Sequence, residues 1–460
     1  MSHMKLFGSK RSGSRLAKNR QKMQAAGGAA PQQSRAVAVR EAPKKKRRNP
    51  LKAVAIVLGC LLVIEILYFT AIFSNNAFIA KWRTIYIETA MDTLSHKWLA
   101  TAIIPDDIIQ EVLAQRRTAL EKQVGQASTW TKEPEPEEPE QDDGPVQIDA
   151  DVTVVPVETE EDRIAQAREA FFELFYEVDE ASLDAYVNAH PEVLDNGWDN
   201  LYINEAGLDD DGTDIETIYG EQILAIDAAN QILLVRVEGS GYIGVLAVAK
   251  DPARLTVQVS SRLGVTGETA GVIADAHNGV LSMTGSGFID PDGNGNGGIL
   301  AGYAMCDGTA YGTAHMGWGY KRLELHEDNL MYIKDASDPV GEGTTDAVEF
   351  QPALIIDGTI VVDSNCGWTG IQPRACIGQS DKYEILMLVI EGRMPWRSNG
   401  THVIECAEIL KRHGCMQAMN LDGGNSAILW YNGEPVTQCA DAKHPEGRKL
   451  PTAFVYGRSE

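Results

Sequence analysis

The stretch that decides how the C-terminal half is interpreted is MNLDGGNSAILWYNGEPV, residues 419–436. Met416–Leu421 is an apolar run that predicts a strand, and Ala427–Tyr431 predicts a second strand. The Asn432-Gly433 pair is typical of a two-residue β-hairpin turn. Asp422–Ser426 is then a tight loop at a strand end, where a carboxylate, an amide, a hydroxyl and backbone N–H groups can converge. An ordinary turn is the alternative, because Asp and Gly are also the commonest turn residues.

Further strands are predicted around this loop from β-branched runs interrupted by glycine. They cover Gln231–Lys250, Arg254–Val265, Glu384–Ile390 and Ala353–Val362, the last with an Asp357-Gly358 hairpin turn. One helix is predicted over His402–Arg412, with Thr401 as its N-cap and His413-Gly414 at its end. Many strands and few helices predict an α+β fold, a mixed-sheet domain.

Charge is distributed unevenly along the 460 residues. The chain has a net charge of −24, yet Met1–Lys52 holds 15 Lys and Arg residues and one acidic residue. This composition predicts a disordered basic arm over residues 1–52. Nucleic-acid binding is not expected, because aromatic residues are almost absent from the arm. Such opposed charges predict different surroundings for the two parts of the chain.

A transmembrane helix is predicted over Ala53–Phe73, an apolar stretch with one charge, Glu65. The basic cluster Lys44–Lys52 places the N-terminus in the cytoplasm by the positive-inside rule, so that the C-terminal domain is extracellular and the lipid bilayer is a partner. Glu65 either pairs within a homo-oligomer or is outweighed by its apolar neighbours.

The segment after the membrane is predicted to hold the domain away from the bilayer. Residues 74–130 have helical periodicity and predict an extracytoplasmic stalk, with a helix start at Pro105-Asp106. Residues 131–157 are an acidic, Pro-rich linker. Residues 158–271 form the N-terminal part of the extracellular α+β region and begin with a helix over Glu158–Val187. Residues 272–460 form the C-terminal domain.

Cysteines and oxygen ligands give two further predictions. Six cysteines follow the membrane segment, and Cys366 with Cys376 or Cys406 with Cys415 lie close in sequence, so partial disulfide bonding is expected, with buried thiols as the alternative. No cysteine spacing resembles a zinc site. Asp290, Asp292 and Asn294 alternate as in calcium loops, but Ala301 occupies the position of the bidentate Glu, so a Gly-rich turn is preferred to calcium.

Four motifs together resemble the phosphodiester glycosidase family. Asn420–Ser426 (NLDGGNS) is similar to its NLDGGGSS signature, and Pro373–Gln379 (PRACIGQ) to its PRTAIG segment. Val389–Arg393 (VIEGR) is similar to its VDGR segment, and Thr284–Gly298 to its early NGGFF element. The departures include Asn425 for the third glycine and Glu391 for the aspartate of DGR. Together with the membrane segment, these departures make the chain resemble a bacterial surface branch of the family, which is associated with exopolysaccharide processing.

The resemblance implies a hydrolase that cleaves sugar-1-phosphate diesters in cell-surface or exopolysaccharide glycans, without a cofactor. The catalytic carboxylates are expected to be Asp422, as nucleophile or base, and Glu391. Contacts to the phosphate and sugar are expected from Arg374, Arg393, Asn420, Gly423, Gly424, Asn425, Ser426, Ser286 and Gly287. The alternative is a non-catalytic glycan-binding or scaffold protein of polysaccharide biosynthesis.

Overall fold

The computed structural model describes residues 50–93, 96–130, 159–208, 212–291, 295–312, 317, 319–363 and 369–459. The predicted basic arm up to residue 49 and the predicted acidic linker lie outside these residues. The chain divides into two units, Met1–Glu65 and Ile66–Glu460. All of the sheets belong to the second unit.

Helix α1, Pro50–Phe73, covers the predicted transmembrane segment. Its Val54–Phe73 stretch has a mean hydropathy of 2.5, and it is the one helix among the described residues that is long and apolar enough to cross a bilayer. Length and composition therefore agree with the prediction of a single membrane span.

The predicted stalk is helical but packs on the sheet domain. It contains α2 (Ala77–Met91), α3 (Trp98–Thr101) and α4 (Asp106–Gln123). At the end of α4, the Gln123 amide donates to the carbonyl oxygen of Ala353 at 3.0 Å. In α2, the Glu88 carboxylate accepts hydrogen bonds from the backbone N–H and the hydroxyl of Thr369 at 2.7 and 2.6 Å. These helices are therefore a wall of the folded unit, and not the spacer that the sequence predicted.

The residues after the linker form two helices where the sequence predicted one. Helix α5, Glu160–Leu174, begins with a capping box between Thr159 and Asp162, and α6 spans Glu180–Ala189. The short 3-10 helices η1 (Pro191–Leu194) and η2 (Trp198–Asn200) come next in the chain. Asp179 caps α6 and breaks the predicted continuous helix.

A nine-stranded antiparallel sheet forms the centre of the fold, in the order β1-β2-β3-β4-β15-β14-β16-β12-β13. The bounds are β1 Tyr202–Asn204, β2 Ile223–Asp227, β3 Ile232–Gly239, β4 Tyr242–Ala249, β12 Ala353–Ile356, β13 Thr359–Ile360, β14 Arg374–Ser380, β15 Ile385–Ile390 and β16 Cys415–Asn420. Because β4 pairs with β15, the predicted parts 158–271 and 272–460 share one sheet.

Two five-stranded antiparallel sheets complete the α+β fold, in the orders β10-β9-β11-β7-β8 and β18-β17-β6-β19-β5. The bounds are β5 Leu255–Val259, β6 Gly279–Thr284, β7 Ala304–Cys306, β8 Thr309–Tyr311, β9 Lys321–His326, β10 Met331–Asp335, β11 Thr344–Phe350, β17 Trp430–Tyr431, β18 Glu434–Pro435 and β19 Thr452–Gly457. The remaining helices are η3 Pro252–Arg254, α7 Ala270–Ala276, α8 Val403–Arg412 and η4 Gly424–Ser426.

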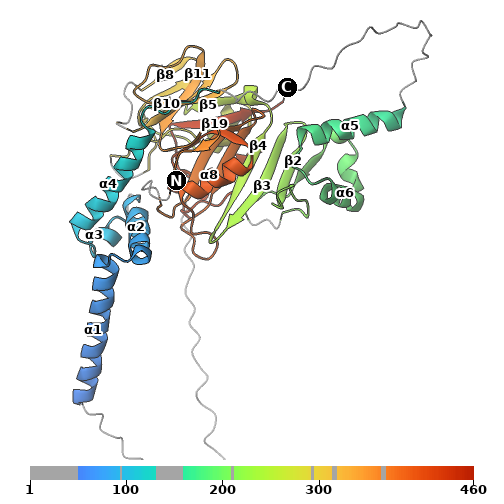
Figure 1. Ribbon diagram of the computed structural model, residues 1–460. Helices are drawn as coiled ribbons and strands as arrows, with labels where there is room; N and C mark the ends of the chain where they lie inside the picture. Colours follow the sequence, from blue (N-terminus) through green and yellow to red (C-terminus); the bar gives the residue numbers. More distant parts are fainter. Residues whose placement is uncertain are drawn as a thin grey trace, which may run out of the picture. The chain divides into compact units, whose positions relative to one another are not determined.

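Both faces of the central sheet are buried. Alternate residues of β15 illustrate this: Leu386 and Leu388 belong to one hydrophobic cluster, whereas Met387 and Val389 belong to another. Helix α8 covers the first face with Val403, Cys406, Ala407, Ile409 and Leu410 (Figure 1). Strands of the two smaller sheets pack on the second face. This layering fixes the strand ends from which the site is built.

Three local predictions differ from the structure. Helix α8 is capped by His402, whose Nδ1 accepts from the Glu405 N–H, and not by Thr401. Strand β17 covers only Trp430–Tyr431 of the predicted run. The predicted pairing of Cys406 with Cys415 is wrong, since both are free thiols, as are Cys306, Cys376 and Cys439. Cys366, the other predicted partner of Cys376, lies outside the described residues.

Candidate functional site

The loop after β16 has the tight geometry that its glycines predicted. Gly423 lies so close to the Pro373 carbonyl oxygen that a Cβ would come within 2.6 Å of it. Gly424 has a φ of +61°, a conformation that residues with a Cβ rarely adopt. Its N–H donates to Pro373 O at 3.1 Å. The loop is thus held against the start of β14, next to Arg374.

Asp422 lines a cavity of about 1310 Å³. Its carboxylate is half-buried and accepts a 2.7 Å hydrogen bond from the Ser426 hydroxyl on Oδ2. Burial raises the pKa of Asp422, against the lowering effect of Ser426 and of the nearby Arg448 and Arg393 guanidinium groups. A carboxylate with a raised pKa is a stronger base when ionised.

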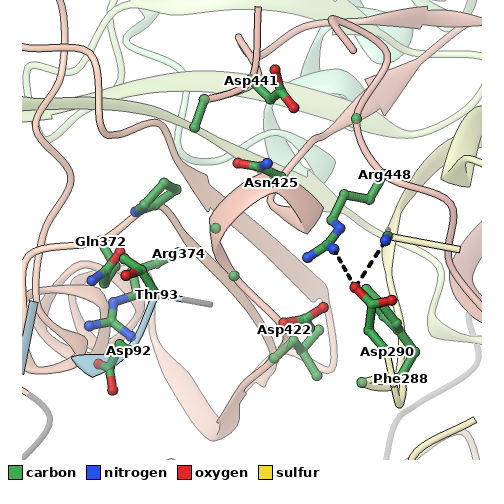
Figure 2. Close-up of a pocket in the computed structure, with 18 of the residues that line it drawn as sticks. Asp92, Thr93, Phe288, Asp290, Gln372, Arg374, Asp422, Asn425, Asp441 and Arg448 are labelled. Atoms are coloured by element: carbon green, nitrogen blue, oxygen red, sulfur yellow. Dashed lines mark hydrogen bonds and ion pairs between the residues drawn. The ribbon is translucent and has the colours of Figure 1, made fainter. Parts of the chain in front are cut away.

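The cavity collects most of the predicted site residues. Those that line it are Gly287, Arg374, Arg393, Asn420, Asp422, Gly423, Gly424 and Asn425. In Figure 2, Asp422 lies between a group that contains Gln372 and Arg374 and the pair formed by Arg448 and Asp290. Residues from separate sequence motifs therefore meet in one space.

Two arginines on one wall are fixed by neighbouring oxygen atoms. Arg374 is buried, and its guanidinium donates to the Thr401 and Gly370 carbonyl oxygens at 3.0 and 2.6 Å. Arg393 donates from Nε and Nη2 to Gln372 Oε1 at 3.0 and 2.7 Å. Two guanidinium groups on one wall favour an anion, because each offers several donors in a fixed plane.

Three predicted site residues lie outside the cavity lining. The buried carboxylate of Glu391 is engaged by the Arg397 guanidinium and by the Gln438 N–H at 2.8 Å. This arrangement does not place Glu391 as a second catalytic carboxylate. Ser286 is buried and hydrogen-bonded to Thr452 at 2.7 Å, so it has a packing position. Ser426 reaches the site through its hydrogen bond to Asp422.

The loop considered for calcium is only partly described, since Asp292 and Asn294 lie outside the described residues. Asp290 lines the cavity, but its Oδ2 accepts from the Gly295 N–H at 2.9 Å and from Arg448 Nη2 at 3.3 Å. Within the described part of the chain, no three His, Cys, Asp or Glu side chains are grouped as metal ligands. The protein's own arginine therefore neutralises this carboxylate.

Several cavity residues were not anticipated from the sequence. Asp92, Thr93 and His96 come from the connection between α2 and α3, and Arg116 comes from α4. Arg116 Nη1 donates to Asp92 Oδ1 at 2.7 Å. The segment predicted as a stalk thus supplies one wall of the site. Its helical periodicity identified the helices, but periodicity does not show which distant surface a helix contacts.

Gln372 and Arg448 were also missed. Gln372 directly precedes the PRACIGQ segment and holds Arg393, and its amide donates to the Thr89 carbonyl oxygen at 2.7 Å. Arg448 packs over the Phe288 ring at 4.7 Å and bonds to Asp290. The position of Gln372 beside a recognised segment was an available signal, whereas nothing in the sequence singled out Arg448.

The fold and the site define an α+β domain whose cavity combines the Asp422 carboxylate, whose pKa is raised by burial, with several arginines. Residues 277–456 match the family model of the phosphodiester glycosidases. The family suggested by the sequence motifs is therefore confirmed for this part of the chain. No curated protein shows a significant match.

Two solved structures are similar to part of the chain. The zebrafish N-acetylglucosamine-1-phosphodiester alpha-N-acetylglucosaminidase catalytic domain, auto-inhibited by its pro-peptide, has a TM-score of 0.41 and 17% identity, over 49% of this chain and 82% of that chain. A hypothetical protein from Synechocystis has a TM-score of 0.35 and 13% identity, over 51% of this chain and 63% of that chain.

Proposed function

We propose that the protein is a membrane-anchored, extracytoplasmic hydrolase that cleaves sugar-1-phosphate diesters in cell-surface or exopolysaccharide glycans. The observation that carries this proposal is the meeting of Asp422, Arg374 and Arg393 in one cavity. They come from three different motifs, and they supply the two chemical functions that the reaction needs, an anion site and a carboxylate. The match of residues 277–456 to the phosphodiester glycosidases supports this chemistry.

The phosphate of the substrate is assigned to the wall that carries Arg374 and Arg393. Guanidinium groups bind phosphate oxygens in paired hydrogen bonds, and both groups are held in place by oxygen acceptors before a ligand arrives. The adjacent Gly423 and Gly424 let the backbone approach the ligand closely. The negative charge that develops on the departing phosphate is thereby stabilised.

Asp422 is assigned the catalytic role at the anomeric carbon of the sugar. The bond between this carbon and the phosphate oxygen breaks, and the phosphate leaves with the electron pair as a monoester. A water oxygen forms the new bond to carbon, and its proton is released. Asp422 either takes that proton or forms a transient bond to the carbon itself. Phosphate is a good leaving group, so the position of Glu391 outside the cavity does not remove a required acid.

Membrane anchoring and topology are inferred from the N-terminal sequence. Helix α1 has the length and the apolar composition of a membrane span. The basic cluster Lys44–Lys52 favours a cytoplasmic N-terminus, which puts the cavity on the outer side.

The test is release of free sugar from an N-acetylglucosamine-1-phosphate diester by the full-length protein in detergent. Asp422→Asn is expected to lower kcat by at least about 100-fold, in the range typical of a lost acid–base group. The matched control is Asp275→Asn, which changes an exposed aspartate of α7 that does not line the cavity. If the folded parent protein binds such diesters without turnover, the result would instead support the glycan-binding alternative.

A further inference from the structure

The first helices after the membrane segment expose an unusual amount of apolar surface. The side chains of Phe78 and Trp98 are 69% and 61% exposed. Together the exposed apolar residues of this region form what we call the aromatic face: Phe78, Trp82, Tyr86, Trp98, Leu99 and Ile103. Soluble surfaces rarely carry so many large apolar side chains in a short segment, and such patches mark contact with a protein or a membrane.

Three residues of this face lie on one side of α2, which is linked to α3. Phe78, Trp82 and Tyr86 recur every four residues on α2, so that they share one side of that helix. Tyr86 then donates its hydroxyl to the Leu99 carbonyl oxygen at 2.8 Å, which ties α2 to α3. The aromatic face is therefore a structured surface and not a frayed end.

The aromatic face is held beside the end of the membrane segment. Tyr68 of α1 donates to the Ile103 carbonyl oxygen at 2.7 Å. Arg83 of α2 donates to the carbonyl oxygens of Ile72 and Ser74 at 2.7 and 3.1 Å. Ile72 is itself buried among residues of α2, α3 and α4. Figure 1 shows α2 and α3 next to this end of α1.

The depth of Tyr68 gives the vertical position of the aromatic face. Tyr68 precedes Phe73, the end of the candidate span, by five residues, which is about 8 Å along a helix axis. Because Ile103 contacts Tyr68, the α3–α4 connection is level with the last turns of the span. Trp and Tyr are enriched at the interface between bilayer and water, which adjoins the end of such a span. The exposed Lys81 of α2 and the exposed Lys97, which directly precedes α3, suit lipid phosphates.

We propose that the aromatic face of α2 and α3 lies in the lipid headgroup region of the leaflet on the side of the folded domain. This proposal rests on the membrane anchoring proposed above. Its consequence for the site is direct, since cavity-lining His96 is two residues from Trp98 of the aromatic face. The part of the cavity that His96 lines is thereby kept close to the bilayer. The substrate class is narrowed to glycan phosphodiesters that are attached to the membrane or held near its surface.

Tryptophan quenching in vesicles tests this proposal. The full-length protein is reconstituted in phosphatidylcholine and phosphatidylglycerol vesicles in which the acyl chains are brominated near the headgroup. The chain has eight tryptophans, and the candidate span contains none of them. We expect quenching of the intrinsic fluorescence, and loss of most of that quenching in the Trp82→Phe/Trp98→Phe protein. The matched control is Trp396→Phe, which removes an 83% exposed tryptophan far along the chain and should leave the quenching unchanged.

The outcomes separate this proposal from the one on which it rests. A protein that fails to float with the vesicles would overturn both the anchoring and the aromatic-face contact. A protein that floats, but whose quenching is the same with and without Trp82 and Trp98, would overturn the contact alone. Shielding of the two tryptophans from aqueous iodide without quenching by brominated lipid would also overturn it, because a second copy of the chain would then cover the face. Sugar release in detergent is independent of all three results.

Discussion

The guanidinium group of Arg393 lies directly over Gly424, so that a Cβ on this glycine would come within 3.2 Å of Nη1. Gly424 also has a φ of +61°. One position of the loop therefore combines a backbone requirement for glycine with a close approach by a proposed phosphate-binding group. The absence of a side chain here is what allows the arginine to rest beside Asp422.

Gly424→Ala is predicted to damage activity more than stability. The left-handed backbone costs about 1–2 kcal/mol with a Cβ, and the added methyl group displaces Arg393. We expect kcat/KM to fall at least about tenfold, since a misplaced positioning group is costly in catalysis. Gly433→Ala is the matched control. It has a φ of +86° and open space around its Cβ, so it should show a similar stability loss in thermal unfolding with normal kinetics.

Gln372 links helix α2 to Arg393, and this link gives a second prediction. Gln372→Ala removes the acceptor of Arg393 and the hydrogen bond to Thr89 O. Hydrogen bonds to charged groups contribute about 1.5–3 kcal/mol, so we expect KM for the diester to rise roughly tenfold or more. Gln372→Glu keeps oxygen acceptors for Arg393 but loses the donor to Thr89. For Gln372→Glu we therefore expect a near-normal KM and a lower stability. An equal rise of KM in Gln372→Ala and Gln372→Glu would contradict the role of Gln372 as the acceptor that positions Arg393.

The sequence predicted those parts of the structure that depend on near neighbours. The Asp357-Gly358 turn joins β12 to β13 with both residues at positive φ, as the sequence indicated. Likewise, the Asp422 loop comes directly after a strand, and α8 covers nearly all of its predicted range. Each of these features is encoded by a few adjacent residues.

The predictions that failed concern features that depend on contacts between distant segments. Glu88 and Thr369 are 281 residues apart, and no periodicity in either segment announces their hydrogen bond. The same limit explains why the segment that contains α2, α3 and α4 was predicted as a stalk. Glu391 shows a related limit, because a strand end fixes the position of a residue but not the direction of its side chain. Here the partner Arg397 determines that direction.

The raised pKa of Asp422 predicts the acid side of the pH–activity profile. Burial stabilises the protonated form, so ionisation for catalysis requires a higher pH than for an ordinary aspartate. The Ser426 hydroxyl opposes this by stabilising the ionised form. In Ser426→Ala the acid limb of kcat/KM should therefore move to higher pH. Ser459→Ala, an exposed serine near the C-terminus, is the control and should not move it. An unmoved acid limb in Ser426→Ala would argue against Asp422 as the titrating group.

Asp422 also affects stability through the same pKa. Because its pKa is higher in the folded than in the unfolded protein, stability from this group is present at low pH and is lost as the pH rises through the folded pKa. Asp422→Asn should consequently be at least as stable as the parent at neutral pH while inactive. Chemical denaturation at acidic and neutral pH measures this difference. A large loss of stability at neutral pH would indicate that the ionised carboxylate supports the fold.

Glu391 distinguishes a structural carboxylate from a catalytic one, and its substitution gives the sharpest contrast with Asp422. Its buried carboxylate is bonded to Arg397 and to the Gln438 N–H. Glu391→Gln removes the negative charge that the Arg397 guanidinium contacts, and we expect the free energy of unfolding to fall by about 2 kcal/mol, below the range for fully buried pairs because the Arg397 side chain is 24% exposed. The folded fraction should keep its kcat. If Glu391→Gln instead remained as stable as the parent and lost turnover as completely as Asp422→Asn, the carboxylate would have to reach the anomeric carbon, which its bonds to Arg397 and Gln438 oppose.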